Sequence, residues 1–227
     1  MGDNNIIVGT FKQAGQSFPM DLSKEKIKKK ELIRPQEPKK PYPYYTEDVS
    51  FTNSIDSITL SGTLTLPSTT GKFPVVVMIS GSGPQNRDEE LLGHKPFLVV
   101  ADHLTKKGIG VLRFDDRGTA KSAGDFKSAT STDFANDVLS AVTYLKTRSD
   151  IDYKNIGLVG HSEGGLIAPM VASDSKDIAF IVLLAGPGIS GYDILLRQTE
   201  LIAKANGSDE LELQTELSLL KGGLDII

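Results

Sequence analysis

Four short apolar runs, separated by helical patterns, constrain the fold most. They cover residues 73–80, 108–114, 155–160 and 178–186, and all four contain β-branched residues. Such runs are typical of strands that are buried on both faces of a parallel sheet. The clearest helical pattern covers residues 132–148, where apolar residues form one stripe and Ser131 or Thr132 is expected to cap the helix. The alternation predicts an α/β fold with a mostly parallel sheet, flanking helices and right-handed crossovers.

The segments on either side of these runs show other patterns. Residues 47–53 and 57–67 alternate apolar and polar residues, which predicts antiparallel strands at the N-terminal edge of the sheet. We interpret residues 1–45 as the remnant of a preceding domain, a strand and a turn without a sheet of its own, followed by a basic, proline-rich linker. Residues 46–188 are the expected core. Residues 189–227 contain two helical patterns and are expected to begin a helical cap.

Composition and charge narrow the classes of function. The formal net charge of −4 gives no electrostatic reason to expect a nucleic acid partner. The absence of cysteine excludes disulfides and thiolate metal sites, and we expect neither a metal nor a cofactor. No apolar run approaches the roughly 20 residues of a membrane span. The N-terminus shows no pattern of a secretory signal. We nevertheless expect the full-length protein to be periplasmic or secreted.

A serine between glycines lies where a strand pattern gives way to a helical pattern, in the run Gly160-His161-Ser162-Glu163-Gly164. A serine hydroxyl is a weak nucleophile, which must be exposed, oriented and deprotonated. A sharp strand-to-helix turn exposes it, and the first N–H groups of the helix face a developing negative charge. Ser162 is therefore the candidate nucleophile. The alternative is a serine that caps a helix at a tight glycine turn.

The loop after the first parallel run, residues 78–89, is the second candidate element of a site. Acyl transfer needs N–H donors for the tetrahedral oxyanion, and one of them is expected from such a loop. Gly81 and Gly83 let the backbone approach a substrate. We assign the donors to the backbone N–H groups of Glu163 and Ser82, with Gly83 as the alternative to Ser82. An ordinary glycine turn is the alternative for the loop.

Three stretches together resemble the α/β-hydrolase superfamily, specifically bacterial carboxylesterases akin to the dienelactone hydrolase and prolyl oligopeptidase branches. They are SGSGPQNRDE, HKPFLVVADHLTKKGIGVLRFDDRGTAKSAG and GHSEGG, and the similarity covers about residues 46–205. The resemblance implies an incomplete α/β-hydrolase fold, Ser162 as nucleophile, the GSG loop as a contributor to the oxyanion hole, and a small-molecule ester as substrate. It also implies that the loop from Asp116 to Ser122 is mostly structural, with Ala120 where relatives usually carry glycine.

The histidine of a catalytic triad has no obvious candidate. In this fold the triad runs serine, acid, histidine along the chain, yet His94, His103 and His161 all precede Ser162. His161 adjoins Ser162, and neighbours on a tight elbow point apart. We expect that the chain is truncated before the acid and the histidine, which the resemblance places after two further strands. We therefore expect the chain alone to be nearly inactive.

Two other residues are candidates to face a substrate, Arg87 and His94. For Arg87 the alternative is a local ion pair with Asp88 that stabilises the loop, and for His94 it is a structural role.

The sequence predicts a serine hydrolase that cleaves carboxylic esters through an acyl-Ser162 intermediate. The alternatives are a serine peptidase of the prolyl-oligopeptidase type and a non-catalytic binding module with the hydrolase fold.

Overall fold

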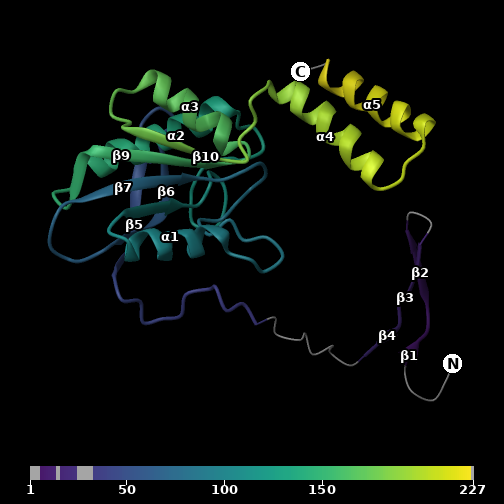
Figure 1. Cartoon of the computed structure of the whole chain (residues 1–227), viewed down its shortest axis with the longest axis horizontal. Helices are drawn as coiled ribbons and strands as arrows, with labels where there is room; N and C mark the ends of the chain where they lie inside the picture. The colour runs from purple at the N-terminus through teal and green to yellow at the C-terminus, as the bar shows by residue number, and fades with distance from the viewer. Residues whose placement is uncertain (1–5, 14–15, 25–32, 226–227) are drawn as a thin grey trace. The chain divides into compact units, whose positions relative to one another are not determined.

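The computed structural model describes residues 6–13, 16–24 and 33–225. The chain divides into two compact units, Met1–Pro35 and Gln36–Ile227 (Figure 1). Each unit is described by itself below.

The smaller unit consists of short strands that pair with one another. Strand β2 (Thr10–Gln13) pairs antiparallel with β3 (Gln16–Pro19), and β1 (Ile6–Ile7) pairs antiparallel with β4 (Leu22–Ser23). The prediction of a strand and a turn without a sheet of its own is wrong, because the segment supplies its own partner strands. Residues 25–32, which form much of the predicted basic linker, lie outside the described residues.

The larger unit is built on a six-stranded sheet with the order β10-β9-β7-β8-β6-β5. The strands are β5 (Tyr45–Asn53), β6 (Ile58–Leu66), β7 (Phe73–Ile79), β8 (Gly110–Phe114), β9 (Ile151–His161) and β10 (Phe180–Leu184). Strands β8, β7, β9 and β10 are parallel, whereas β6 pairs antiparallel with both β5 and β8. The mostly parallel sheet with antiparallel N-terminal edge strands is therefore confirmed.

Helices cover both faces of this sheet (Figure 1). Helix α1 (Pro96–Lys106) packs on one face, where Phe97 and Ala101 join a buried cluster with side chains of β7, β8 and β9. Helices α2 (Ser131–Lys146) and α3 (Gly164–Asp174) contribute to the larger cluster on the other face. The inner strands of the sheet are thus covered on both sides, as the β-branched runs predict.

The cap of helix α2 differs from the prediction. Thr130, rather than Ser131 or Thr132, is the N-cap residue. The side chain of Thr130 accepts the N–H of Asp133, and the Asp133 carboxylate accepts the N–H of Thr130 at 2.7 Å. The prediction is wrong because Asp133, three positions after Thr130, can return a hydrogen bond to the backbone of the cap residue, which favours Thr130 over the next two hydroxyls.

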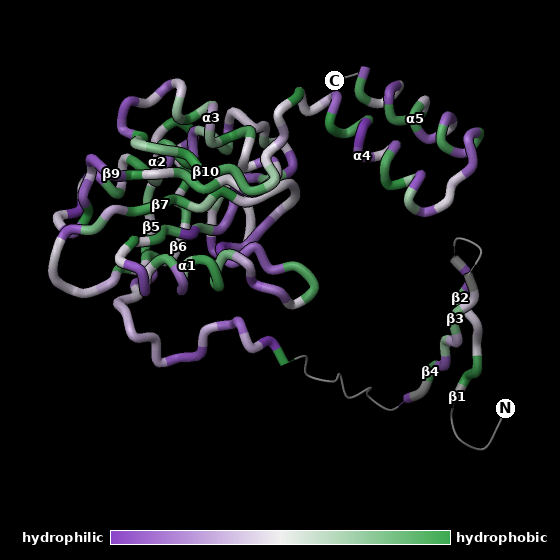
Figure 2. Tube along the Cα trace, in the orientation of Figure 1, coloured by the Kyte–Doolittle hydropathy of each residue, from purple (hydrophilic) through white to green (hydrophobic). Residues whose placement is uncertain are grey.

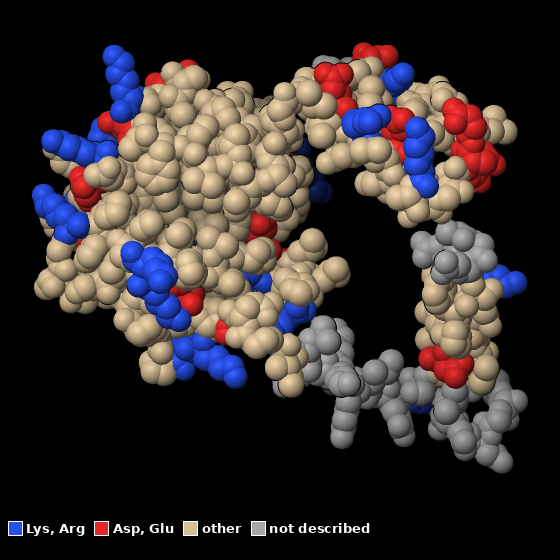
Figure 3. All heavy atoms as spheres, in the orientation of Figure 1, with Lys and Arg blue, Asp and Glu red and all other residues tan. Residues whose placement is uncertain are grey.

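The edge strand β10 exposes its apolar side chains. Its residues, Phe180–Leu184, are between 36% and 45% exposed, although every one of them is apolar. Figure 2 shows the hydrophobic colour along β10 as well as along the inner strands. In Figure 3 the atoms drawn over the region of β9 and β10 are mainly those of uncharged residues. In this structure the sheet therefore has an uncovered apolar edge.

Two helices follow the sheet, as predicted. Helix α4 (Gly191–Ala205) packs against α5 (Glu210–Leu224), and Ala203 and Leu213 are buried. Ser190 caps α4 and Asp209 caps α5 through their side chains. Among the helices of the described residues, none is both long enough and apolar enough to cross a membrane.

Candidate active site

The turn between β9 and α3 presents Ser162. Its φ is +51°, a left-handed conformation that is uncommon for a residue with a side chain and that persists where surrounding contacts hold it. The Ser162 N–H donates to the Leu184 carbonyl at 2.9 Å, and the Ser162 carbonyl accepts the Gly165 N–H at 2.8 Å. A Cβ atom on Gly160 would lie 2.0 Å from the Gly164 carbonyl oxygen, so only glycine allows this tight reversal.

The glycine loop after β7 lies directly against Ser162. A Cβ atom on Gly81 would lie 3.1 Å from the Cβ atom of Ser162. The Gly81 N–H donates to Glu89 Oε1 at 2.8 Å, so this donor is occupied. Within the described part of the chain, no hydrogen bond is recorded from the N–H groups of Ser82, Gly83 or Glu163. These three groups stay the candidate oxyanion donors.

Two pockets meet at Ser162. One, of about 240 Å³, is lined by Gly81, Ser82, Gln85, Glu89, Leu91, Pro96, His161 and Ser162. The lining of the other includes Ser82, Ser162 and Glu163. The structure therefore brings the predicted nucleophile and two of the predicted donor residues to one surface.

A carboxylate that sequence reasoning missed also lines the 240 Å³ pocket. Glu89 is 5% exposed, and its Oε1 atom lies 2.7 Å from Nδ1 of His161. The His161 side chain is 44% exposed, so one side of the ring contacts Glu89 while the rest is accessible. No motif in the sequence points to this pair, because 72 positions separate the two residues.

Arg87 holds the loop rather than lining either of these pockets. Its Nε and Nη2 atoms donate to the two carboxylate oxygens of Asp115 at 3.1 and 2.7 Å, and Nη1 donates to Thr63 at 2.8 Å. The ion-pair alternative thus describes its geometry, but with Asp115 instead of Asp88. Asp88 pairs with Arg113.

His94 is exposed and does not line the two pockets of Ser162. Its backbone exchanges hydrogen bonds with Leu91, at 2.9 and 3.1 Å, in the loop before α1. His103 lies on an exposed position of α1. Across residues 6–13, 16–24 and 33–225, no group of three or more His, Cys, Asp or Glu side chains could hold a metal ion.

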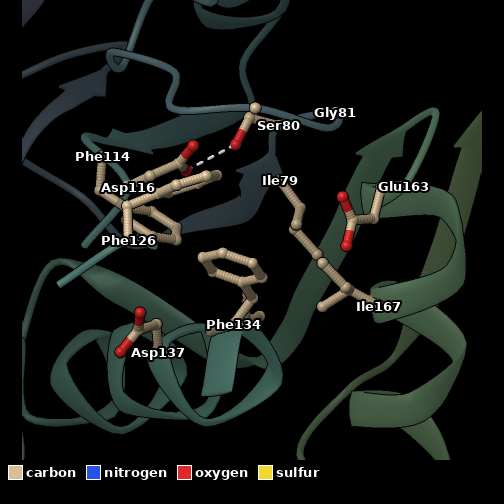
Figure 4. A pocket seen from close by; sticks show the side chains of 12 residues that line it. Ile79, Ser80, Gly81, Phe114, Asp116, Phe126, Phe134, Asp137, Glu163 and Ile167 are labelled. Carbon is tan, nitrogen blue, oxygen red and sulfur yellow. Dashed lines mark hydrogen bonds between the residues drawn. The ribbon is translucent and has the colours of Figure 1, made fainter. Parts of the chain in front are cut away.

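A small cavity of about 20 Å³ lies behind the glycine loop and has Asp116 in its wall (Figure 4). It has room for about one water molecule. The Ser80 hydroxyl donates to Asp116 Oδ1 at 2.6 Å, and the Gln85 N–H donates to Oδ2 at 2.9 Å. Burial raises the pKa of Asp116 to about 7, although these hydrogen bonds oppose the rise; Asp137 and Glu89 add to it. Asp116 therefore binds the loop on both sides of its glycines.

Replacing Asp116 with asparagine is expected to flatten the pH dependence of stability. The pKa of this carboxyl is raised from 3.8 to about 7, so between these values the folded state binds more protons than the unfolded chain. The contribution of Asp116 to the free energy of unfolding therefore falls as the pH rises from about 4 to about 7, by about 4 kcal/mol in total. Asparagine cannot ionise. In urea unfolding at several pH values, the free energy of unfolding of D116N should therefore rise relative to that of the wild type across this window. Parallel profiles would contradict the assignment.

The fold and the site define a class of protein. A parallel sheet with a serine on a left-handed turn between strand and helix, beside a glycine loop from the neighbouring strand, is characteristic of the α/β-hydrolase superfamily. A family model described as "X-Pro dipeptidyl-peptidase (S15 family)" matches residues 56–221. The chain therefore belongs to the X-Pro dipeptidyl-peptidase (S15) family.

Curated proteins with similar sequences agree with this class. Esterase EstD of Thermotoga maritima is 34% identical over 146 residues, which are 64% of this chain and 35% of EstD. Dipeptidyl peptidase 8 of Homo sapiens is 32% identical over 161 residues, which are 66% of this chain and 18% of that protein. The chain thus spans about a third of the length of EstD and less than a fifth of the peptidase.

Solved structures show the same fold. The Pyrococcus furiosus esterase Pf2001 has a TM-score of 0.56 at 27% identity, covering 71% of this chain and 57% of that one. The α/β hydrolase GrgF from Penicillium sp. sh18 has a TM-score of 0.56 at 22% identity, covering 80% and 67%, and supports the fold alone. Together with the family match, EstD and Pf2001 support a serine hydrolase of the α/β fold.

Proposed function

We propose that this protein hydrolyses carboxylic esters through an acyl-serine intermediate on Ser162. The observation that carries the proposal is the left-handed turn at Ser162, which presents the hydroxyl to a pocket shared with the open N–H groups of Ser82 and Glu163. The similarity to EstD and Pf2001, both named as esterases, favours an ester as substrate.

The proposed reaction has two steps. The Ser162 Oγ atom attacks the ester carbonyl carbon, its proton passes to a base and then to the leaving oxygen, and an alcohol departs from the acyl-serine. Water then attacks the same carbonyl carbon, which releases the carboxylic acid and restores the hydroxyl. In both steps the N–H groups of Glu163 and of Ser82, or alternatively Gly83, stabilise the tetrahedral oxyanion.

The proposal assigns no base among the described residues. His161 Nδ1 contacts Glu89, and neither His94 nor His103 lines the pockets of Ser162. Oxyanion stabilisation and binding without a triad leave roughly 10³- to 10⁴-fold catalysis over water. We therefore expect slow turnover by this chain alone, and a much faster reaction wherever an imidazole is supplied beside Ser162.

Replacing Ser162 with alanine tests the nucleophile. A fluorophosphonate probe should label the wild type on Ser162 during long incubation, and S162A should stay unlabelled because no other group forms the adduct. Hydrolysis of p-nitrophenyl acetate should fall to the uncatalysed rate. Ser173→Ala, the same change on helix α3, should react as the wild type does. Equal labelling of S162A would contradict the proposal, and fast Ser162-dependent turnover would contradict the missing base.

A peptidase is the second candidate, favoured by the description of the matching family and by the similarity to dipeptidyl peptidase 8. Peptide cleavage needs a proton for the leaving amine, which a triad histidine ordinarily delivers. A phenolate leaves an ester without that help, so the ester is the better substrate for this chain. Comparing p-nitrophenyl acetate with a Gly-Pro p-nitroanilide separates the two, and preferential cleavage of the anilide would favour the peptidase.

A further inference from the structure

The proposed mechanism leaves a buried carboxylate beside Ser162 without a role. One oxygen of Glu89, Oε1, accepts the Gly81 N–H at 2.8 Å and lies 2.7 Å from His161 Nδ1. Glu89 is 5% exposed and has a φ of +50°. A residue with a side chain keeps such a backbone conformation only where its surroundings hold it, and functional sites are where such residues gather.

Glu89 connects two separate pieces of backbone. Gly81 belongs to the loop after β7, whereas His161 is the last residue of β9. Ser82 follows Gly81 directly, and Glu163 lies two residues after His161. Each candidate oxyanion donor is therefore within two residues of a group that Glu89 holds.

The relative position of these donors decides how well an oxyanion is bound. The donor nitrogens must lie about 2.7–3.1 Å from the oxyanion, and loss of one donor typically costs 10²- to 10³-fold in kcat. Gly81 itself cannot serve, because its N–H is taken by Glu89. A contact that fixes the loop against the elbow thus controls the spacing of the two donors that remain.

We propose that Glu89 is a positioning residue for the oxyanion hole. By accepting hydrogen bonds from Gly81 and from His161 Nδ1–H, it sets the Ser82 N–H relative to the Glu163 N–H. The inference rests on the proposed function, since it concerns the same site. The role requires an acceptor rather than a negative charge, because one oxygen makes both contacts and a glutamine amide oxygen accepts in the same way. His161 is the partner of Glu89 and not the base.

The test compares Glu89→Gln with Glu89→Leu in binding phenylboronic acid. This probe adds to a serine oxygen and forms a tetrahedral anion that resembles the intermediate. Glu89→Gln should bind within about threefold of the wild type, whereas Glu89→Leu should bind roughly 10- to 100-fold more weakly, somewhat less than loss of a whole donor. Ser162→Ala should form no adduct. In ester hydrolysis, Glu89→Leu should lower kcat and leave KM nearly unchanged.

Two further variants guard against a loss of folding. Thr65→Val removes a buried hydroxyl contact of 2.7 Å with Thr105, far from Ser162 in the sheet, and should lower stability without weakening boronate binding. Should Glu89→Leu not fold, Glu89→Asp keeps the charge but is too short to reach both partners, and it should also bind more weakly.

Several outcomes would overturn the inference. Wild-type affinity in Glu89→Leu or Glu89→Asp would show that the contact does not set the site, and an equal loss in Glu89→Gln would show that charge is what matters. Equal weakening in Thr65→Val would assign the effect to stability. Each of these leaves the proposed function intact, whereas a wild type that forms no Ser162 adduct would overturn both proposals.

Discussion

Replacing Gly164 with alanine is expected to destabilise the protein by about 4 kcal/mol or more and to abolish probe labelling of Ser162. A Cβ atom there would lie 2.3 Å from the Ile79 carbonyl oxygen and 2.7 Å from that of Ser80. Both oxygens belong to backbone at the end of β7, which cannot rotate away as a flexible side chain could. The elbow would have to move off the sheet, and Ser162 would move with it.

The same substitution at an open position is the matched control. A Cβ atom on Gly222, inside helix α5, would meet nothing within 4 Å. Gly222→Ala should therefore raise the free energy of unfolding of the helical pair by about 0.5–1 kcal/mol, because alanine restricts the unfolded chain and favours helix. Urea unfolding followed by circular dichroism measures both variants. Wild-type stability in Gly164→Ala would mean that the elbow does not approach β7 so closely.

Much of the fold could be predicted from local patterns. The β-branched runs identify the parallel strands, since a strand covered on both faces is apolar at most of its positions. Strand β10 has the same pattern, although its side chains are partly exposed. The place of Ser162 follows similarly, because the glycines that allow the turn flank it in the sequence. The left-handed backbone of Ser162, with a φ of +51°, could not be predicted from the residue itself, because serine has no preference for that conformation.

The contacts that organise the site could not be predicted in the same way. Arg87 pairs with Asp115, 28 positions away, and Glu89 contacts His161, 72 positions away. Both pairs depend on the strand order β9-β7-β8, which brings the ends of three strands together. Periodicity shows that a strand exists but not which strand lies beside it, so the neighbouring Asp88 was the natural partner to expect for Arg87.

Replacing Arg117 with methionine is expected to lower the free energy of unfolding by about 3–5 kcal/mol, because it removes one partner of a buried ion pair and leaves the other charge buried. Asp137 is 1% exposed and accepts hydrogen bonds from Arg117 Nε at 2.7 Å and Nη2 at 2.9 Å, and from Asn53 at 2.7 Å. Burial by itself would lower the pKa of Arg117, yet the hydrogen bonds to Asp137 and Asp56 raise it above its ordinary value. Without Arg117, Asn53 is the buried partner that the Asp137 carboxylate keeps among the described residues.

The burial of an ion pair, and not the distance between its charged atoms, should decide how much free energy of unfolding is lost when one partner is removed. Lys146 and Asp177 lie 2.6 Å apart, but their side chains are 39% and 44% exposed. Lys146→Met should therefore change the free energy of unfolding by less than about 1 kcal/mol. The double variant Arg117→Met/Asp137→Leu should recover much of the loss, because it removes the stranded carboxylate as well. Urea unfolding of the four proteins measures this, and equal losses in Arg117→Met and Lys146→Met would contradict the argument from burial.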